Sequence, residues 1–144
     1  MRIAVGAESR PGERRVALVP GLVSRLIEVG LEVVVELGAG VAAGFTDVEY
    51  RDAGAVVDSG ALDGAGVVLS VWPLSPGQVG RLGSAAITIS FLPTAQELEL
   101  VGALRAAGHT GLAMELVPRI SRAQGMDALS SQAFVAGYRA VLVA

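Results

Sequence analysis

The alternation of short apolar runs with helix-like segments constrains the fold of this chain more than any other feature of its sequence. An apolar run at residues 2–6 precedes a stripe of apolar residues at helical spacing between Pro20 and Gly30, and the alternation continues along the chain. This pattern is typical of α/β proteins with parallel sheets. We therefore expect a three-layer α/β fold, Rossmann-like or flavodoxin-like, in which helices flank a mainly parallel sheet. The expected strands are residues 2–6, 32–37, 55–57, 66–71, 86–91 and 109–114.

Helix starts are indicated by residues that can cap free backbone N–H groups. A Ser or Thr followed three residues later by Glu can form a capping box, and a proline suits the first helical turn. The expected starts are a helix at Pro20, capping boxes at Thr46/Glu49 and Thr94/Glu97, and an N-cap at Ser75 before Pro76.

The segment from Asp127 to the C-terminus predicts a last helix. Its apolar residues fall on one face, and the pattern reaches Ala144 without a glycine, proline or polar tail. We expect this helix to continue in further chain. The residues on that face are Phe134, Tyr138, Val141 and Leu142.

Composition excludes several classes of function. The chain has no cysteine, its 11 basic residues are all arginine, and His109 is the single histidine. Disulfides, thiolate or histidine-rich metal sites and Schiff-base chemistry are therefore not expected. The net charge of −3 without a basic cluster argues against nucleic acid as a partner. We expect a cytoplasmic chain, since neither a targeting peptide nor a membrane span is apparent.

A glycine-rich segment, ELGAGVAAG at residues 36–44, is close to the dinucleotide-binding fingerprint. Its glycines, Gly38, Gly40 and Gly44, are spaced one residue off G-x-G-x-x-G, and the Thr46 cap follows before any helix begins. No acidic residue closes a convincing strand at the required distance. We interpret the segment as a loop rather than a phosphate-binding turn.

Two polar segments follow expected strands, at the sheet edge where α/β proteins bind ligands. The first segment follows residues 2–6 and contains Arg14 and Arg15. An arginine there could bind a carboxylate or phosphate with two hydrogen bonds, although the local sequence favours a solvated surface pair. The second, residues 115–132, gathers polar side chains between a strand and the last helix, and Asp127 could simply cap that helix. Its polar residues are Arg119, Ser121, Arg122, Gln124, Asp127, Ser130 and Ser131. We do not expect a catalytic triad based on His109, which is interpreted as a surface residue at the edge of a strand. Trp72 is expected to pack or to lie beneath further chain.

Three stretches resemble one family over essentially the whole length of the chain. They are RIAVGAESRPGERRVALVP, EVVVELGAGVAAGFTDVEYRDAGA and MELVPRISRAQGMDALSSQAFVAGYRAVL. The sequence resembles the family that contains alanine dehydrogenase and the NAD(H)-binding component of the proton-translocating NAD(P)+ transhydrogenases, and the last stretch is close to the transhydrogenase form. The resemblance implies that residues 1–125 are an N-terminal domain without the G-x-G-x-x-G half. It implies that residues 126–144 begin a helix crossing to an NAD-binding domain.

The resemblance also implies a function and its residues. Arg119, Gln124 and Asp127 would act as the catalytic set, with Ser130 beside them, and would position bound nicotinamide for direct hydride transfer between NADH and NADP+. Such a transfer needs orientation rather than a general base. The implied enzyme is of the proton-translocating type and not of the Si-specific class. NADP(H) would bind a partner component, and no metal would be needed.

The same resemblance implies partners and a location. The expected partners are membrane-embedded and NADP-binding components and a second copy of the subunit, with no nucleic acid. The chain would be cytoplasmic and held at the inner membrane by its partners. The chain by itself would be inactive.

Two alternatives remain open at this stage. In alanine dehydrogenase, the residue that matches Arg15 contacts the substrate carboxylate, but the lysine and histidine of that site are matched here by Trp72 and Pro93. An alanine or pyruvate site therefore looks disabled, which leaves Arg15 with a structural role or a nucleotide contact. The second alternative is a non-catalytic domain that only docks onto partners.

Overall fold

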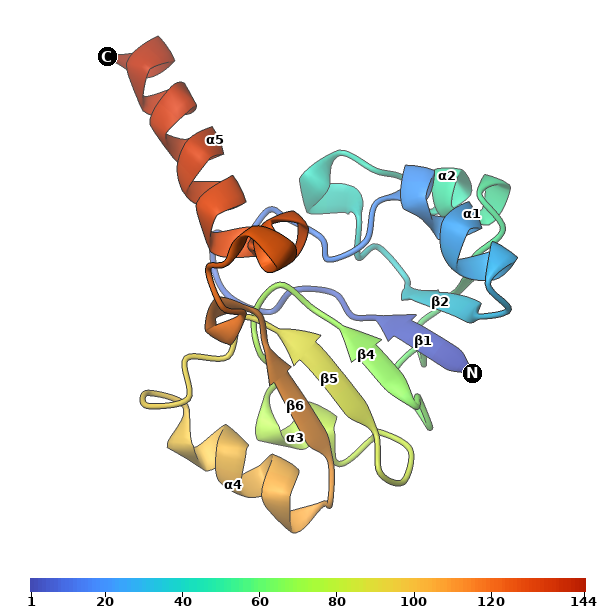
Figure 1. Ribbon diagram of the computed structural model, residues 1–144. Coiled ribbons are helices and arrows are strands. Elements are labelled where there is room, and N and C mark those ends of the chain that lie inside the picture. The colour runs from blue at the N-terminus through green and yellow to red at the C-terminus, as the bar shows by residue number, and fades with distance from the viewer.

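A single parallel sheet forms the centre of the computed structural model, which describes all 144 residues (Figure 1). Its strand order, β3-β2-β1-β4-β5-β6, is the doubly wound order. Strands are added on one side of β1 as far as β3 and then on its other side from β4, so the switch point lies between β1 and β4. The expected α/β fold is confirmed, and the sheet is parallel at every pairing. This order matches the Rossmann arrangement rather than the flavodoxin one. The strands are β1 (Arg2–Val5), β2 (Glu32–Glu36), β3 (Val56–Asp58), β4 (Val67–Leu69), β5 (Ile87–Ser90) and β6 (Thr110–Ala113).

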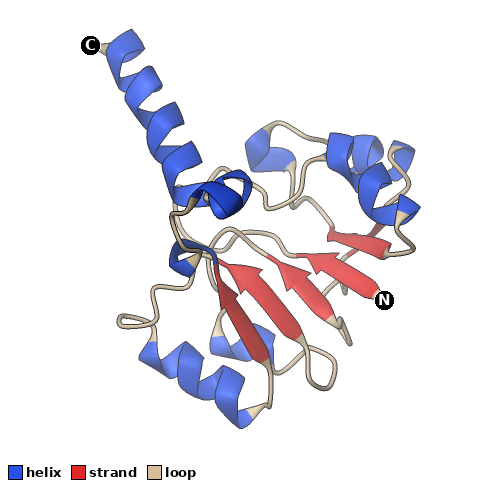
Figure 2. Cartoon of the chain, in the orientation of Figure 1, coloured by secondary structure: helices blue, strands red, loops and turns tan.

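Helices cover both faces of the sheet and create two cores. Neighbouring residues of β1 point to opposite faces: Ala4 packs in one core with Leu100, and Val5 packs in the other with Val23. The first core lies under α3 (Pro76–Val79) and α4 (Leu98–Ala106), and the second lies under α1 (Pro20–Glu28) and α2 (Asp47–Asp52). The result is the three-layer arrangement, visible in Figure 2 as helices above and below the strands.

The capping signals were right in two cases and wrong in one. Thr46 with Glu49 forms a complete capping box at α2, and Ser75 caps α3 with Gln78 as its reciprocal partner. The box at Thr94 and Glu97 does not form, because α4 begins only at Leu98 and has no side-chain cap. The Glu97 carboxylate instead pairs with Arg10, 87 residues away.

The glycine-rich segment is a loop, as interpreted from its sequence. It contains a short 3-10 helix, η1 (Val41–Ala43), and Gly44 that follows adopts a left-handed φ of 89°. A Cβ atom at Gly40 would lie 2.6 Å from the ring of Tyr50. Tyr50 is fully buried, and its hydroxyl donates to the Leu18 carbonyl at 2.8 Å. Gly40 therefore allows the backbone to pass close to a core tyrosine.

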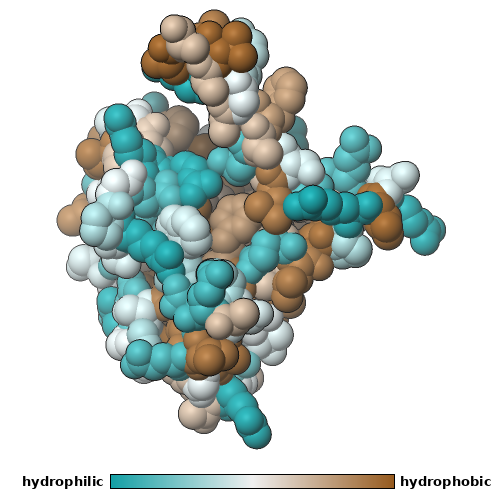
Figure 3. All heavy atoms as spheres, turned by 90° about the vertical axis from the view of Figure 1, so that its left-hand side faces the viewer, coloured by the Kyte–Doolittle hydropathy of each residue, from teal (hydrophilic) through white to brown (hydrophobic).

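The last helix, α5 (Ala128–Val143), extends away from the body of the domain (Figure 1). None of its residues is buried, and Phe134, Tyr138 and Val141 are 75%, 64% and 79% exposed. Figure 3 shows apolar side chains at the protruding end of this helix. Two short 3-10 helices, η2 (Met114–Leu116) and η3 (Ser121–Met126), lie in the segment expected to be a loop before it. No helix of this structure combines the length and the hydrophobicity that a transmembrane span requires.

Candidate functional site

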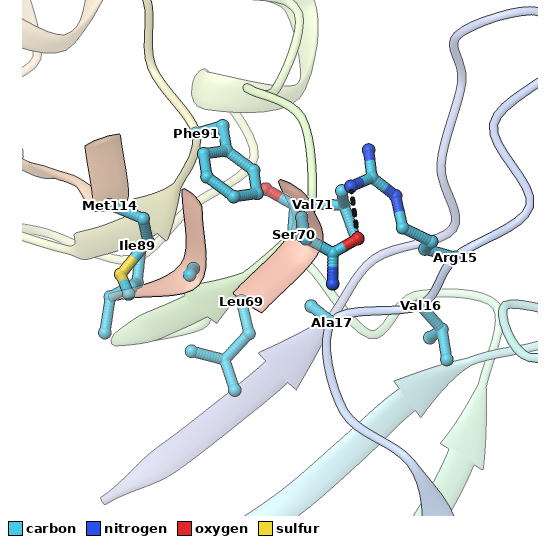
Figure 4. Close-up of a pocket in the computed structure, with 11 residues that line it drawn as sticks. Arg15, Val16, Ala17, Leu69, Ser70, Val71, Ile89, Phe91 and Met114 are labelled. Carbon is cyan, nitrogen blue, oxygen red and sulfur yellow. Dashed lines mark hydrogen bonds between the residues drawn. The ribbon is translucent and has the colours of Figure 1, made fainter. Parts of the chain in front are cut away.

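Two hollows flank the N-terminus of α5 at the carboxyl edge of the sheet. The first, here called the switch-point cavity, has a volume of about 350 Å³ and lies at the switch point between β1 and β4 (Figure 4). Doubly wound folds bind ligands at this place. The cavity is mostly apolar, and its lining residues are Arg15, Val16, Ala17, Leu69, Ser70, Val71, Ile89, Phe91, Met114, Ala128 and Gln132.

The second hollow, here called the loop hollow, has a volume of about 260 Å³ and is more exposed. Its lining residues are Arg119, Ile120, Ser121, Gln124, Asp127 and Ser130. The structure therefore brings together the four residues that the family resemblance assigns to the nicotinamide. Arg15 is not among them, because it lies in the switch-point cavity on another side of the α5 N-terminus.

Asp127 caps α5, as its position in the sequence allowed. Its carboxylate accepts the backbone N–H of Ser130 at 2.9 Å and the Ser130 hydroxyl at 2.5 Å. These bonds to Ser130, with a smaller contribution from the charge of Arg119, lower the pKa of Asp127. Because an ionised carboxylate can only accept, the Ser130 hydroxyl must donate to it, and its lone pairs remain available to a ligand.

Arg119 and Gln124 differ from Asp127 in having uncommitted side chains. Neither makes a hydrogen bond within the protein, so their donors can turn toward a ligand in the loop hollow. Arg122 also lacks a partner but does not line the hollow.

The interpretation of Arg14 and Arg15 as a solvated pair holds for Arg14 and is wrong for Arg15. Arg14 is exposed and makes one long bond, from Nε to the Ala42 carbonyl at 3.4 Å. Arg15 donates from Nε and Nη2 to the two carboxylate oxygens of Glu13, at 2.8 and 2.6 Å. The Glu13 side chain is only 8% exposed, and its bonds to Arg15 lower its pKa to about 2. The fork of Arg15 is therefore already occupied by a carboxylate of its own loop.

Trp72 packs at the end of β4, as expected, and also supports Glu13. Its Nε1 donates to Glu13 at 2.7 Å, and its ring lies 4.3 Å from the Arg10 guanidinium carbon. The Glu8 carboxylate accepts the backbone N–H groups of Val71 and Trp72 at 2.6 and 3.1 Å. Burial raises the pKa of Glu8. These contacts tie the loop after β1 to the carboxyl end of β4.

Sequence reasoning missed three residues around the switch-point cavity. Gln132 accepts a hydrogen bond from Arg15 Nη1 at 3.1 Å, and the Ser70 hydroxyl is buried without a partner. Glu13 had a local signal, since it lies two residues before Arg15, but nothing local marks Ser70 or Gln132.

His109 has a structural contact rather than a catalytic one. Its Nδ1 accepts the backbone N–H of Ala86 at 3.1 Å, just before β5 begins. No group of three potential metal-ligating side chains is close enough to hold an ion.

Comparison with known proteins identifies the family. Residues 4–136 match the family described as alanine dehydrogenase/PNT, N-terminal domain. NAD(P) transhydrogenase subunit alpha of Cereibacter sphaeroides is 44% identical over 100% of this chain. The crystal structure of transhydrogenase from Sinorhizobium meliloti superposes on the whole chain with a TM-score of 0.95 and 41% identity. For an L-alanine dehydrogenase structure the TM-score is 0.75, with 33% identity over 81% of this chain.

The chain spans only a fraction of each of these proteins. It covers 28% of the Cereibacter protein, 44% of the Sinorhizobium chain and 33% of the alanine dehydrogenase chain. The resemblance inferred from the sequence is nevertheless confirmed: this chain belongs to the alanine dehydrogenase/PNT N-terminal domain family and is a homologue of the NAD(P) transhydrogenase alpha subunits.

Proposed function

We propose that this chain belongs to the NAD(H)-binding component of a proton-translocating NAD(P)+ transhydrogenase. In this proposal, the loop hollow positions the nicotinamide of NAD(H) for direct hydride transfer to NADP+. The observation that carries it is the gathering of Arg119, Gln124, Asp127 and Ser130 around one hollow. Residues 1–125 would form the domain and residues 126–144 the helix that leads to an NAD-binding domain.

The donors and acceptors in the loop hollow suit a carboxamide. The lone pairs of Ser130, whose hydroxyl is turned to Asp127, can accept from a carboxamide NH₂ group. Arg119 and Gln124 can donate to the carboxamide oxygen. Together they would fix which face of the ring points outward. The bound nucleotide supplies the hydride, and these side chains contribute orientation.

The rest of the enzyme enters the proposal through the same family. NADP(H) would bind a separate component, and proton translocation would take place in a membrane-embedded partner. The subunit would be a homodimer on the cytoplasmic side of the inner membrane.

The geometry of the switch-point cavity argues against an alanine dehydrogenase activity. A substrate carboxylate would have to displace Glu13 from Arg15, and Trp72 and Pro93 stand where the resemblance places the lysine and histidine of that activity. The complete enzyme should therefore show no alanine-dependent reduction of NAD, and robust turnover would move the assignment to alanine dehydrogenase.

The proposal is tested by Gln124→Asn in the complete subunit, assayed with its NADP-binding partner. The shorter side chain should misplace the ring while contacts elsewhere on the nucleotide stay intact. We expect stopped-flow hydride transfer to slow by about tenfold, with the Kd for NADH changed by less than about threefold. Gln96→Asn, the same change at an exposed residue outside both hollows, should leave both quantities unchanged. Equal losses in rate and affinity for Gln124→Asn would contradict a positioning role.

A further inference from the structure

Within these 144 residues, the α5 helix contacts the domain at its N-terminal end. No residue of the helix is buried by this part of the protein, so the contacts at that end are the ones that orient it here. The fixed points are its N-terminal connection through η3 and its contacts with η2. This end of α5 also carries Ser130 and follows Asp127, so its direction determines where the loop hollow faces.

One side-chain hydrogen bond joins α5 to a distant segment of the chain. Arg15 Nη1 donates to Gln132 Oε1 at 3.1 Å across 117 residues of sequence, and the dashed line at Arg15 in Figure 4 marks this bond. The other side-chain bonds of α5 stay within its own first turn. Because helical residues rise by about 1.5 Å each, Gln132 lies only about 3 Å along the axis from Ser130. A displacement of Gln132 would therefore move Ser130 by a similar amount.

Arg15 can fix the position of Gln132 because its own guanidinium is fixed by Glu13. Glu13 binds two nitrogens of its guanidinium and leaves Nη1 directed to α5. Glu13 in turn accepts from Trp72 Nε1 at the end of β4. A continuous series of hydrogen bonds thus runs from Trp72, which follows β4, to the helix. An arginine held by two bonds to Glu13 gives that series one geometry.

We propose that Glu13, Arg15 and Gln132 form a bridge that sets the direction of α5, and that Arg15 is a positioning residue acting on the loop hollow through Gln132. The catalytic half of this inference rests on the proposed function; the structural half does not. A displacement of about 1 Å in a reacting group can slow a reaction by up to about a hundredfold, so the bridge would affect hydride transfer without touching nucleotide.

Kinetics of the complete subunit with its NADP-binding partner test the catalytic half. We expect Arg15→Met and Gln132→Ala each to slow single-turnover hydride transfer by about five- to a hundredfold, with the Kd for NADH within about threefold of wild type. The double variant should be no slower than the single variants, because both remove the same bridge. Arg15→Lys should recover only some of the rate, since an ammonium cannot bind both Glu13 oxygens and Gln132 as the fork does. Arg14→Met is the matched control and should transfer hydride at the wild-type rate.

Three kinetic results would overturn the bridge. Effects of the two single variants that multiply in the double variant would mean that Arg15 and Gln132 act separately. A loss of NADH affinity equal to the loss of rate would make Arg15 a nucleotide ligand. If Arg14→Met slowed hydride transfer as much as Arg15→Met, the loss of a positive charge, and not the loss of the bridge, would explain the slower rate.

The direction of α5 can be measured without any hydride transfer. Spin labels on cysteines introduced at the exposed Arg25 of α1 and Arg139 of α5 report it by pulsed dipolar spectroscopy of the complete subunit, and this chain adds no cysteine of its own. Arg15→Met and Gln132→Ala should shift or broaden the distance distribution in the same way, whereas Arg14→Met should not. An unchanged distribution would refute the bridge. If the variants change the distance distribution but the wild-type subunit transfers no hydride, the bridge is supported and the proposed function is refuted.

Discussion

Two arginines in the loop after β6, three residues apart, differ in where the structure places them. Arg119 lines the loop hollow, whereas Arg122 lies outside it. Hydrogen bonds from Ser130 are the main cause of the lowered pKa of Asp127, and the charge of Arg119 adds a smaller contribution. A hydrogen bond from a charged group to a ligand contributes about 1.5–3 kcal/mol once water is excluded, whereas a solvated arginine contributes little. Arg119→Ala in the complete subunit should therefore slow transhydrogenation by roughly ten- to a hundredfold.

Arg122→Ala is the matched control for that prediction. Its rate should stay within a few-fold of wild type in the same steady-state assay. If the two variants behave alike, or if Arg122→Ala is the more damaging, the assignment of Arg119 to the nicotinamide is wrong even though the family is established.

Glu13 should make the stability of the chain depend on pH. Its pKa falls from 4.5 to about 2 because the folded protein holds the ionised form against Arg15. A lowered carboxyl pKa contributes stability above the unfolded value, and this contribution is lost as the pH falls through the folded value. Glu13→Gln should therefore be less stable than wild type by about 1–3 kcal/mol at pH 7, and the difference should shrink between pH 4.5 and pH 2.

Urea denaturation of the two proteins across this pH range measures the difference. Glu28→Gln, an exposed glutamate without a hydrogen-bond partner, should differ little from wild type at every pH. A Glu13→Gln deficit that persists unchanged at pH 2 would show that the side chain contributes through packing rather than through its charge.

The start of α5 combines a helix cap with the candidate site, and one substitution separates the two roles. Asp127→Asn keeps an oxygen that can accept the Ser130 N–H, and asparagine is a good N-cap. The amide nitrogen, however, would donate to the Ser130 hydroxyl, which would then present its proton to the ligand instead of its lone pairs. We expect unchanged helix content by circular dichroism and hydride transfer about tenfold slower in the complete subunit.

Ser131→Ala is the control for this change. Ser131 is exposed and its hydroxyl donates only to the Asp127 carbonyl, so its loss should leave transfer unchanged. If Asp127→Asn transferred hydride at the wild-type rate, the only role of Asp127 would be to cap α5.

At the level of elements, the sequence was a good guide where the deciding contacts are local. The capping box at Thr46 needs only Glu49, three residues on, and it forms as predicted. The box at Thr94 does not form: α4 begins only at Leu98, and Glu97 pairs instead with Arg10 from the loop after β1. The candidate site follows the same rule. Arg119 to Ser130 span 12 residues and could be placed together from the sequence, whereas the bond from Arg15 to Gln132 joins the two ends of the chain.

For the whole molecule, the Rossmann strand order is present without the contacts that usually accompany it. Dinucleotide phosphates normally meet a glycine-rich turn and a helix N-terminus directly after β1. Here that connection is the loop of residues 6–19, and α1 begins at Pro20, which has no N–H to offer. The acidic residue at the end of β2, Glu36, binds the loop itself, since its Oε2 accepts the backbone N–H of Ala7 at 2.8 Å.

These absences predict how the 144-residue chain alone should behave toward nucleotide. The loop hollow offers a few exposed hydrogen bonds to the nicotinamide, each contributing about 0.5–1.5 kcal/mol, and association itself costs several kcal/mol. A Kd of 1 mM already requires about 4 kcal/mol of net binding free energy. We therefore expect calorimetry to give a Kd for NADH weaker than about 1 mM, and nicotinamide mononucleotide to bind equally weakly because the adenosine half finds no contact. A low-micromolar Kd for NADH would contradict this prediction and would require a phosphate site within these residues. NADH binding much tighter than the mononucleotide would locate that site on the adenosine side of the cofactor.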